Sequence, residues 1–323
     1  MAFGRKFRNV IVLAKIETSK GTDAVPTGAA NAMLPVGEVA IAPIDAERVP
    51  RSVIRGYFGA PDSLLGATWM SIKFSVEMQG SGTKGTAPAW GALLRACGFA
   101  ETVTAATRVD YTPVSTGLEG VTIYAYADGL EYKFVGSVGT VDIAAGVGGI
   151  PLLNFTFWAP YLAPTAVANP TPTLTSWKVP ALVNDLNTAD VSLGGTYSAG
   201  AISGGTTYVS GGIEATLANQ VSRRELIGAK EAVISDRAVG GTIKTLDLTA
   251  AQEITVQGLI TGNTPTSIGM VHGTTDGYKV LLFFTAAKLL NINPVNLDGV
   301  WTSDVTFEAP PAAGNDDMRI VAL

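Results

Sequence analysis

The stretch FSVEMQGSGTKGTAPAWGALLRACGFA, Phe74 to Ala100, decides between two fold classes because Gly80, Gly82 and Gly85 have the spacing GxGxxG. This spacing marks a dinucleotide cradle only where a buried parallel strand runs directly into a helix. Apolar and polar side chains alternate over residues 71–79, so one face of this strand is wet. A strand of a doubly wound sheet is apolar on both faces. The alternation therefore argues against a dinucleotide-binding enzyme.

The residues after the glycines predict a helix that starts too late to hold a phosphate. Pro88 suits a first helical position and Gly98 a helix end, and the apolar residues between them follow helical spacing: Trp90, Leu93, Leu94 and Cys97. The other phosphate motif, GxxxxGK[ST], fails because Lys84 precedes Gly85. We therefore predict that GSGTKGT binds no nucleotide and is a flexible connector.

The composition predicts a mainly β chain of two domains. The 323 residues are 47% hydrophobic and 15% charged, with 37 Gly and 17 Pro, and can bury a sizeable core. Short alternating runs of valine, threonine and aromatic residues favour many strands and few helices. No apolar run has the ~20 residues of a membrane helix, and the N-terminal run breaks at Lys15 without a signal-peptide pattern. We expect no membrane contact and no export.

The residue types that usually carry chemistry are scarce. Cys97 and His272 are the only residues of their kinds, which excludes a Cys/His zinc site, and no GxSxG elbow is present. Several acids stand in turn-like contexts, where turn chemistry explains them: Asp45, Asp110, Asp128 and Asp276. The net charge of −5 gives no basic stripe for nucleic acid. We predict no catalytic, cofactor-binding or metal site.

Ten segments have the alternation of strands, in the cadence of a sandwich or barrel. They are NVIVLAKIE, TWMSIKFSVEMQ, GVTIYAYAD, LEYKFVGS, PLLNFTFWA, GGTIKTLDL, EITVQGLI, YKVLLFF, VWTSDVTFE and MRIVAL. Prolines crowd the segment from Pro160 to Pro180, which suits an extended connector. We predict a first β-domain at 1–165, a Pro-rich connector at 166–180 and a second, related β-domain at 181–323.

Short matches between the two sides of the connector suggest a duplication. DGLEYK at Asp128 resembles DGYK at Asp276, and FTFWAP at 155–160 resembles VTFEAP at 305–310. A looser third match pairs VEMQG with ITVQG, so that Gln79 and Gly80 correspond to Gln257 and Gly258. Two similar β-domains with exposed edges and no chemistry are typical of a subunit that completes itself by assembly.

The sequence resembles the major tail tube proteins of long-tailed, siphophage-type bacteriophages over nearly its whole length. The resemblance is strongest in KIETSKGTDAVPTGAANAMLPVGEVAI, in VEMQGSGTKGTAPAWGALLRACGFAETV with YTPVS, and in YAYADGLEYKFVGSVGTVDI. It continues more weakly through IEATLANQVSRRELIGAKEAVISDR to TSDVTFEAP, and the second half carries a Gly-rich insert, GGTYSAGAISGGTTYVSGG. The block GSGTKGTAPAWGALLRACGF, taken whole, is its most specific part.

This resemblance implies tandem tail-tube β-sandwich or barrel domains, each with at most one short flanking helix. It implies rings stacked into a hollow tube through which DNA passes without specific binding, in a virion tail assembled in the host cytoplasm. Family rings are sixfold, so two domains per chain imply a trimeric, pseudo-hexameric ring, whereas an illusory duplication requires six chains. The implied partners are the tape measure protein, the tail terminator and the distal tail proteins.

Two long loops are the candidates for contacts between stacked rings, because the long strand-connecting loop of the family reaches the next ring. They span 49–67 and 220–241 and mix arginines with apolar residues, as interfaces do. The candidate contact residues are Arg48, Arg51, Arg55, Tyr57, Phe58, Arg223, Arg224 and Arg237. Glu77, on the wet face of its strand, is the candidate lumen residue, although an ordinary surface charge explains it equally well.

Two other classes compete with the structural protein. A secreted or surface β-sandwich binding module, such as a lectin or adhesin, needs an export route and an exposed aromatic platform. A hydrolase needs an acid pair or histidine and cysteine partners, which are scarce here. Rings or tubes in electron micrographs separate the structural class from both. The sequence leaves open whether the tail is contractile.

Overall fold

The computed structural model describes residues 4–323 and is mainly β, with 52% strand and 6% helix. The strands of the first 166 residues are β1 (Val10–Ile16), β2 (Ala32–Met33), β3 (Pro35–Arg51), β4 (Asp62–Glu77), β5 (Phe99–Thr104), β6 (Arg108–Pro113), β7 (Val121–Ala127), β8 (Leu130–Gly146), β9 (Leu152–Pro160) and β10 (Thr165–Ala166). The later strands are β11 (Val191–Leu193), β12 (Thr196–Ser198), β13 (Ala201–Ser203), β14 (Thr206–Tyr208), β15 (Gly212–Thr216), β16 (Gln220–Leu226), β17 (Ala229–Asp236), β18 (Gly240–Leu246), β19 (Thr266–His272), β20 (Val280–Leu297), β21 (Val300–Glu308) and β22 (Arg319–Ala322). The helices are α1 (Gly91–Ala96) and α2 (Ala250–Thr261).

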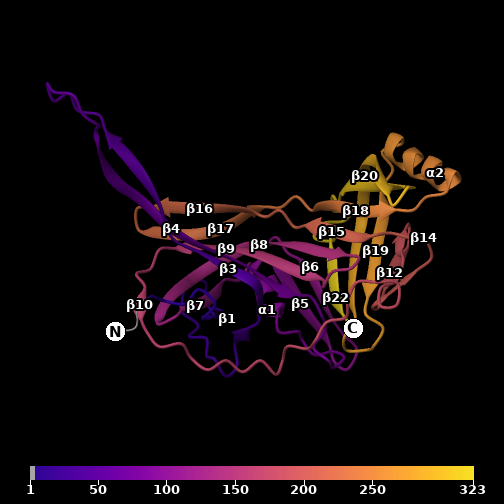
Figure 1. Cartoon of the computed structure of the whole chain (residues 1–323), viewed down its shortest axis with the longest axis horizontal. Helices are drawn as coiled ribbons and strands as arrows, with labels where there is room; N and C mark the ends of the chain where they lie inside the picture. Colours follow the sequence, from indigo (N-terminus) through magenta and orange to yellow (C-terminus); the bar gives the residue numbers. More distant parts are fainter. Residues whose placement is uncertain (1–3) are drawn as a thin grey trace.

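One antiparallel sheet runs through both halves of the molecule (Figure 1). Its strands are hydrogen-bonded in the order β3, β4, β9, β8, β15, β18, β21 and β20. We call this the central sheet. Within the described chain, the outer edge of β3 and the second part of β20 pair with no further strand in this sheet.

Two further sheets form the second layer of a sandwich. The first contains β2, β1, β7, the beginning of β8 and β10. The second contains β14, β11, β19, the beginning of β20, β22, β6 and β5. The long strands β8 and β20 each pass from the second layer into the central sheet, so both layers are one connected structure.

The alternation predicted over residues 71–79 is confirmed and shows where the core lies. Ile72, Phe74 and Val76 are buried, and the side chains between them are exposed or half-buried. Phe74 packs on Phe155 and Phe157 of β9 with ring centroids 6.1 and 6.2 Å apart. Burying such alternate positions on both layers is the main stabilising force of a sandwich.

Nine of the ten predicted strand segments are confirmed, and one is wrong. EITVQGLI lies in helix α2, which begins with a capping box in which Thr249 and Gln252 bond each other's backbone amides. Only Val256 of this helix is buried. The apolar run is short, and such runs do not distinguish strand from helix by periodicity alone. Among residues 4–323, no helix is long and apolar enough to cross a lipid bilayer.

The two segments expected to be long loops are mostly β-hairpins. Strands β3 and β4 stay paired out to Arg51 and Asp62, and only residues 52–61 form a loop. Strands β16 and β17 are paired from Gln220 opposite Asp236 to Leu226 opposite Ala229, with a two-residue turn between them. Both hairpins are exposed on both faces over much of their length, so their sequences lack the alternation that marks a half-buried strand.

The two halves share a strand order. In the central sheet, the order β3, β4, β9, β8 is followed by β15, β18, β21, β20. Along the chain, each set consists of an antiparallel pair, then a long strand, then the strand that returns beside it. The DGLEYK and DGYK segments both lie where a strand of the second layer turns into the long strand. The third match is wrong, because Gln79 follows a strand whereas Gln257 lies within α2.

The proline-rich segment lies along the first half of the chain (Figure 1). The amide of Thr173 donates to the carbonyl of Gly28 at 2.8 Å, and the indole of Trp177 donates to the carbonyl of Ala32 at 2.9 Å. Prolines lack amide donors, so the segment is held at its other residues. It therefore joins the halves as an ordered strap.

Candidate assembly interface

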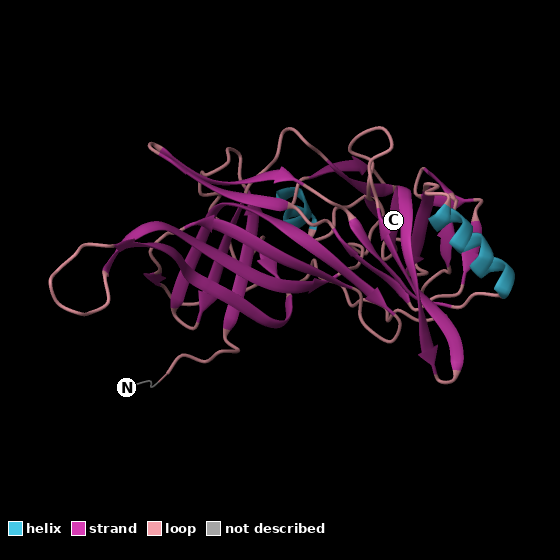
Figure 2. Ribbon diagram, turned by 90° about the horizontal axis from the view of Figure 1, so that it is seen from above, coloured by secondary structure: helices cyan, strands magenta, loops and turns pink. Residues whose placement is uncertain are grey.

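The hairpin of β3 and β4 projects from one end of the molecule as an arm, opposite the end that carries α2 (Figures 1 and 2). We define the arm as residues 48–65. Its tip carries Ile54 and Phe58 fully exposed and Tyr57 72% exposed. Exposed apolar side chains gathered at one place mark interaction sites in soluble proteins. The arm is therefore the candidate contact element among residues 4–323.

The arm is also basic. Arg48, Arg51 and Arg55 are exposed and form no ion pair with residues 4–323. Arginine and aromatic side chains together are the residues most enriched at binding hot spots. Five of the candidate contact residues are thus brought together on one exposed hairpin.

The hairpin of β16 and β17 lies against the first half instead. Its apolar residues Val221, Ala232 and Ile234 pack on Trp69, Val138 and Trp158. Arg223 forms an ion pair with Asp45, and Arg224 lies 3.5 Å from Glu231. Both candidate residues are thus engaged within the chain: Arg223 ties the hairpin to the first half, and Arg224 pairs across the hairpin itself.

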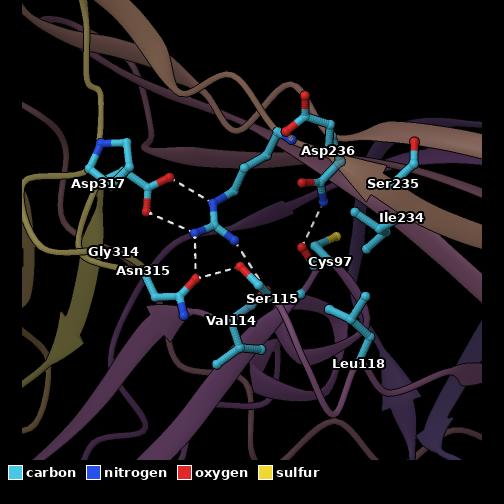
Figure 3. A pocket seen from close by; sticks show the side chains of 14 residues that line it. Cys97, Val114, Ser115, Leu118, Ile234, Ser235, Asp236, Gly314, Asn315 and Asp317 are labelled. Carbon is cyan, nitrogen blue, oxygen red and sulfur yellow. Dashed lines mark hydrogen bonds and ion pairs between the residues drawn. The ribbon is translucent and has the colours of Figure 1, made fainter.

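Arg237 lines a cavity of about 430 Å³ between the halves. Figure 3 shows this cavity, with Asp317, Asn315 and Val114 among its labelled residues. The guanidinium of Arg237 lies 2.7 Å from Asp317, donates to Asn315 at 2.9 Å and to the carbonyl of Val114 at 3.1 Å. Asn219 donates to the backbone carbonyl of Cys97 at 2.7 Å. The polar groups of the cavity are therefore satisfied by one another, and Arg237 links β17 to segments on both sides of it.

Glu77 ends strand β4 on the face of the central sheet that points away from the core. It is half-buried, and burial raises the pKa of its carboxyl. The same face carries Asp142, Glu214 and Asp304, with Lys244 at 3.3 and 3.4 Å from the last two. Acidic side chains thus recur across both halves of this face.

The single cysteine and the single histidine are both buried. Cys97 is buried, and its burial raises the pKa of its thiol. The negative charge of the nearby Asp142 raises it further, so the weakly nucleophilic thiol form prevails. His272 is 2% exposed and shares a 2.9 Å hydrogen bond between its Nδ1 and Thr188, and burial lowers its pKa. Over residues 4–323, no three His, Cys, Asp or Glu side chains gather as metal ligands.

The glycine-rich segment packs against the second half. The amide of Gly82 donates to the carbonyl of Gly277 at 2.8 Å, and Lys84 lies 2.6 Å from Asp276. Hydrogen bonds from Lys279 and, to a lesser extent, from Lys84 lower the pKa of Asp276 to about 2. These glycines therefore permit a close approach between two backbones.

We expect Gly80→Ala to lower the free energy of unfolding by about 1–3 kcal/mol, because a Cβ there would lie 2.1 Å from the backbone oxygen of Gly277. Gly258→Ala is the control, since a Cβ in this part of α2 meets no atom within 4 Å. It should stabilise by up to about 1 kcal/mol through helix propensity. Urea unfolding measures both. Equal effects would contradict the close-packing role, and saturable NAD or ATP binding lost in Gly82→Val would contradict the absence of a nucleotide site.

Sequence reasoning missed the two free edges of the central sheet. They lie on β3, most of which belongs to none of the predicted strand segments, and on the second part of β20, which lies beyond the predicted segment YKVLLFF. The signal was present as exposed prolines, Pro43 and Pro294, since proline within a sheet is confined to edges and bulges.

The sequence model of the phage tail tube protein family matches residues 8–320. No curated protein matches the chain. The chain belongs to the phage tail tube protein family, and it is a viral structural protein of the virion tail. Membership in this family implies self-assembly into a tube together with other tail proteins.

Proposed function

We propose that this chain forms rings that stack into the hollow tail tube through which DNA leaves the phage. The observation that carries the proposal is the central sheet, which among residues 4–323 ends at two edge strands, β3 and the second part of β20, each paired on one side only. Unpaired strand edges are ready to bind another strand, and natural monomers usually cover or shorten them. Edges this long favour a subunit whose sheet continues into the next subunit.

The repeated strand order supports three chains per ring. Each half contributes four strands in the same order to the central sheet, so three chains supply six similar units. Two related domains, 1–165 and 181–323 joined by the connector 166–180, agree with this reading. A cyclic ring with one heterologous interface closes when the rotation per chain divides the circle evenly.

The face that carries Glu77 is the candidate lumen surface. It carries the polar side chains of the central sheet, and hairpin β16–β17 covers the part of it at Trp69, Val138 and Trp158, while the other face is covered by the second layer. Acidic and neutral side chains do not retain the phosphate backbone, whereas many lysines and arginines would hold it by releasing counterions. DNA can therefore pass without specific binding.

The arm is the candidate contact between stacked rings, and it extends beyond every other part of the molecule in Figure 1. The tape measure protein would occupy the tube before DNA, and the tail terminator and distal tail proteins would bind its two ends. These roles require no catalytic chemistry of the chain itself.

Electron microscopy of the purified protein, together with native mass spectrometry of isolated rings, tests the proposal. We expect tubes or stacked rings with pseudo-sixfold end views and a mass of three chains. Rings of six chains would contradict the trimer but not the tube. A protein that stays monomeric under all conditions of concentration and salt would contradict both.

A further inference from the structure

The join between the two halves of one chain is a strand pair that is covered on both sides. Residues 142–146 of β8 pair with residues 212–216 of β15, with Ala144 opposite Glu214. The pairing continues at both ends, since the amide of Leu217 donates to the carbonyl of Val141 at 3.0 Å and the amide of Val147 donates to the carbonyl of Gly211 at 2.9 Å. The residues of this join that face the core are at most 5% exposed: Val141, Ile143, Ala145, Ile213, Ala215 and Leu217.

The two free edge strands of the central sheet correspond to the two strands of the internal join, as the register of the inner strands shows. Strands β9 and β21 lie at the same position in each half, and FTFWAP and VTFEAP align Phe157 with Phe307. Phe157 is opposite Ile72, which is opposite Ile41. Phe307 is opposite Gly241, which is opposite Ala215. Ile41 of β3 therefore corresponds to Ala215 of β15, and Ala40 corresponds to Glu214.

The same procedure relates β20 to β8. Asn154 of β9 is opposite Asp142, and the aligned Asp304 of β21 is opposite Asn293. Two residues further along, Val295 takes the place of Ala144. The second part of β20 is therefore the counterpart of the part of β8 that forms the internal join.

The core-facing residues of the two free edges are incompletely buried. Val39 and Ile41 on β3 and Ile292 on β20 are half-buried, although all three pack against the main core. Their counterparts at the internal join, Ile213 and Ala215 among them, are almost completely buried. The free edge of β3 thus has the apolar row of the join without the strand that covers it, whereas on β20 the row begins with Ile292 and Pro294 and ends with the exposed Asn296 in the place of Ala145.

We propose that the internal join is repeated between chains, with Asn293–Leu297 of β20 pairing antiparallel to Glu38–Ala42 of β3 in the next chain. The register copies that of the internal join, so that Val295 is opposite Ala40. This inference rests on the proposed ring and names the strand pair that closes it. It buries the half-exposed row and pairs backbone groups that are open in one chain.

The charges and shapes near the two edges agree with this pairing. Inside the chain, the turn between β8 and β9 meets the segment before β11, because Gly148 donates to the carbonyl of Val183 at 2.9 Å. The equivalent turn between β20 and β21 would meet the segment before β1 in the next chain. That turn carries Asp298 with the exposed apolar residues Leu297, Val300 and Trp301. A cavity of about 240 Å³ beside β3 is lined by Arg5, Lys6, Phe7, Val10, Val39 and Ile41.

Two prolines make the proposed pairing weaker than the internal one. Pro294 takes the place of Ile143, whose backbone faces β15, and Pro43 takes the place of Leu217, whose amide donates across the join. Proline has no amide hydrogen, so each removes one hydrogen bond. Prolines on edge strands also limit pairing with wrong partners. The two prolines therefore make pairing of single chains before assembly less favourable.

Disulfide cross-linking of Ala40→Cys with Val295→Cys tests the register. Alternate pairs of an antiparallel ladder lack mutual hydrogen bonds. In the internal join, the odd-numbered residues Val141 and Val147 direct their backbones to β15, so the even-numbered Ala144 and its partner Glu214 form a pair without hydrogen bonds. The pair 40/295 takes the place of that pair. The Cα atoms of such pairs are about 4.5 Å apart, which a disulfide spans. Positions 40 and 295 lie on opposite edges of one chain, so a disulfide must join two chains. Cys97 is buried and leaves the background low.

Under mild oxidation of assembled protein, we expect most chains of the 40/295 variant to migrate as dimers and trimers on non-reducing gels, with nothing larger. Ala46→Cys with Val295→Cys, about 20 Å out of register, is the control and should remain monomeric. Tubes without cross-links in the 40/295 variant, or with equal cross-linking in the control, overturn the proposed pairing and leave the tube intact. Ladders that end at six chains support the pairing and overturn the trimer. No assembly of the unmodified chain overturns both.

Discussion

Arg237→Met should lower the free energy of unfolding by about 3–5 kcal/mol, the usual effect of removing one partner of a buried ion pair. The side chains of Arg237 and Asp317 are only 16% and 4% exposed. Methionine fills a similar volume but leaves the carboxylate of Asp317 without its cation and the carbonyl of Val114 without its donor. The loss should also reduce ring formation, because Arg237 ties hairpin β16–β17 to both halves.

Urea unfolding followed by tryptophan fluorescence measures the effect, and Arg224→Met on the same hairpin is the matched control. Arg224 and Glu231 are 58% and 43% exposed, and exposed pairs of this kind contribute at most about 1 kcal/mol. The double variant Arg237→Met/Asp317→Leu should recover much of the loss, because it removes the unpaired charge. If Arg237→Met and Arg224→Met behave alike, the buried tie between the halves is wrong.

Reversing two charges on the arm, Arg51→Glu with Arg55→Glu, should stop the tube from lengthening while the β-fold stays intact. Both side chains are exposed and unpaired within residues 4–323, so their loss costs the monomer little. Across an interface, like charges placed together cost several kcal/mol, which is roughly a hundredfold or more in the constant for adding a ring. Any residual assembly should depend strongly on salt, because ions screen the repulsion.

Light scattering and electron microscopy at low and high ionic strength follow tube growth, and circular dichroism verifies the fold. Arg51→Lys with Arg55→Lys keeps the charge and should assemble nearly as the unmodified chain does. If the doubly reversed protein polymerises with unchanged kinetics and tube length, the arm does not mediate stacking, and the chain termini are the next candidates.

Much of the fold follows from local patterns that the sequence carries by itself. The alternation of residues 71–79 predicted a strand with one wet face, and burial of Phe74 and Val76 confirms it. The spacing from Trp90 to Cys97 predicted helix α1, which spans Gly91–Ala96. Such patterns suffice because a half-buried strand or helix shows its periodicity in the order of its own residues.

The same local reasoning argued against a nucleotide site, but it did not reveal what the glycines do. Gly80 and Gly82 lie against Gly277, almost two hundred residues later. Close approach of two distant backbones leaves no mark in a local pattern except the glycines themselves. EITVQGLI failed for a related reason, since its few apolar residues fit either period and the capping box decided for a helix.

The assembly surfaces depend on tertiary structure alone. Arginines in similar sequence contexts differ in their burial in the folded chain: Arg55 is exposed on the arm, whereas Arg237 donates to Asp317 and Asn315. The sequence determined which residues alternate, and therefore that the chain is mainly β. Only the folded sheet decided which strands remain at its edges, because pairing joins segments far apart in the chain and an edge is defined by the neighbour that it lacks.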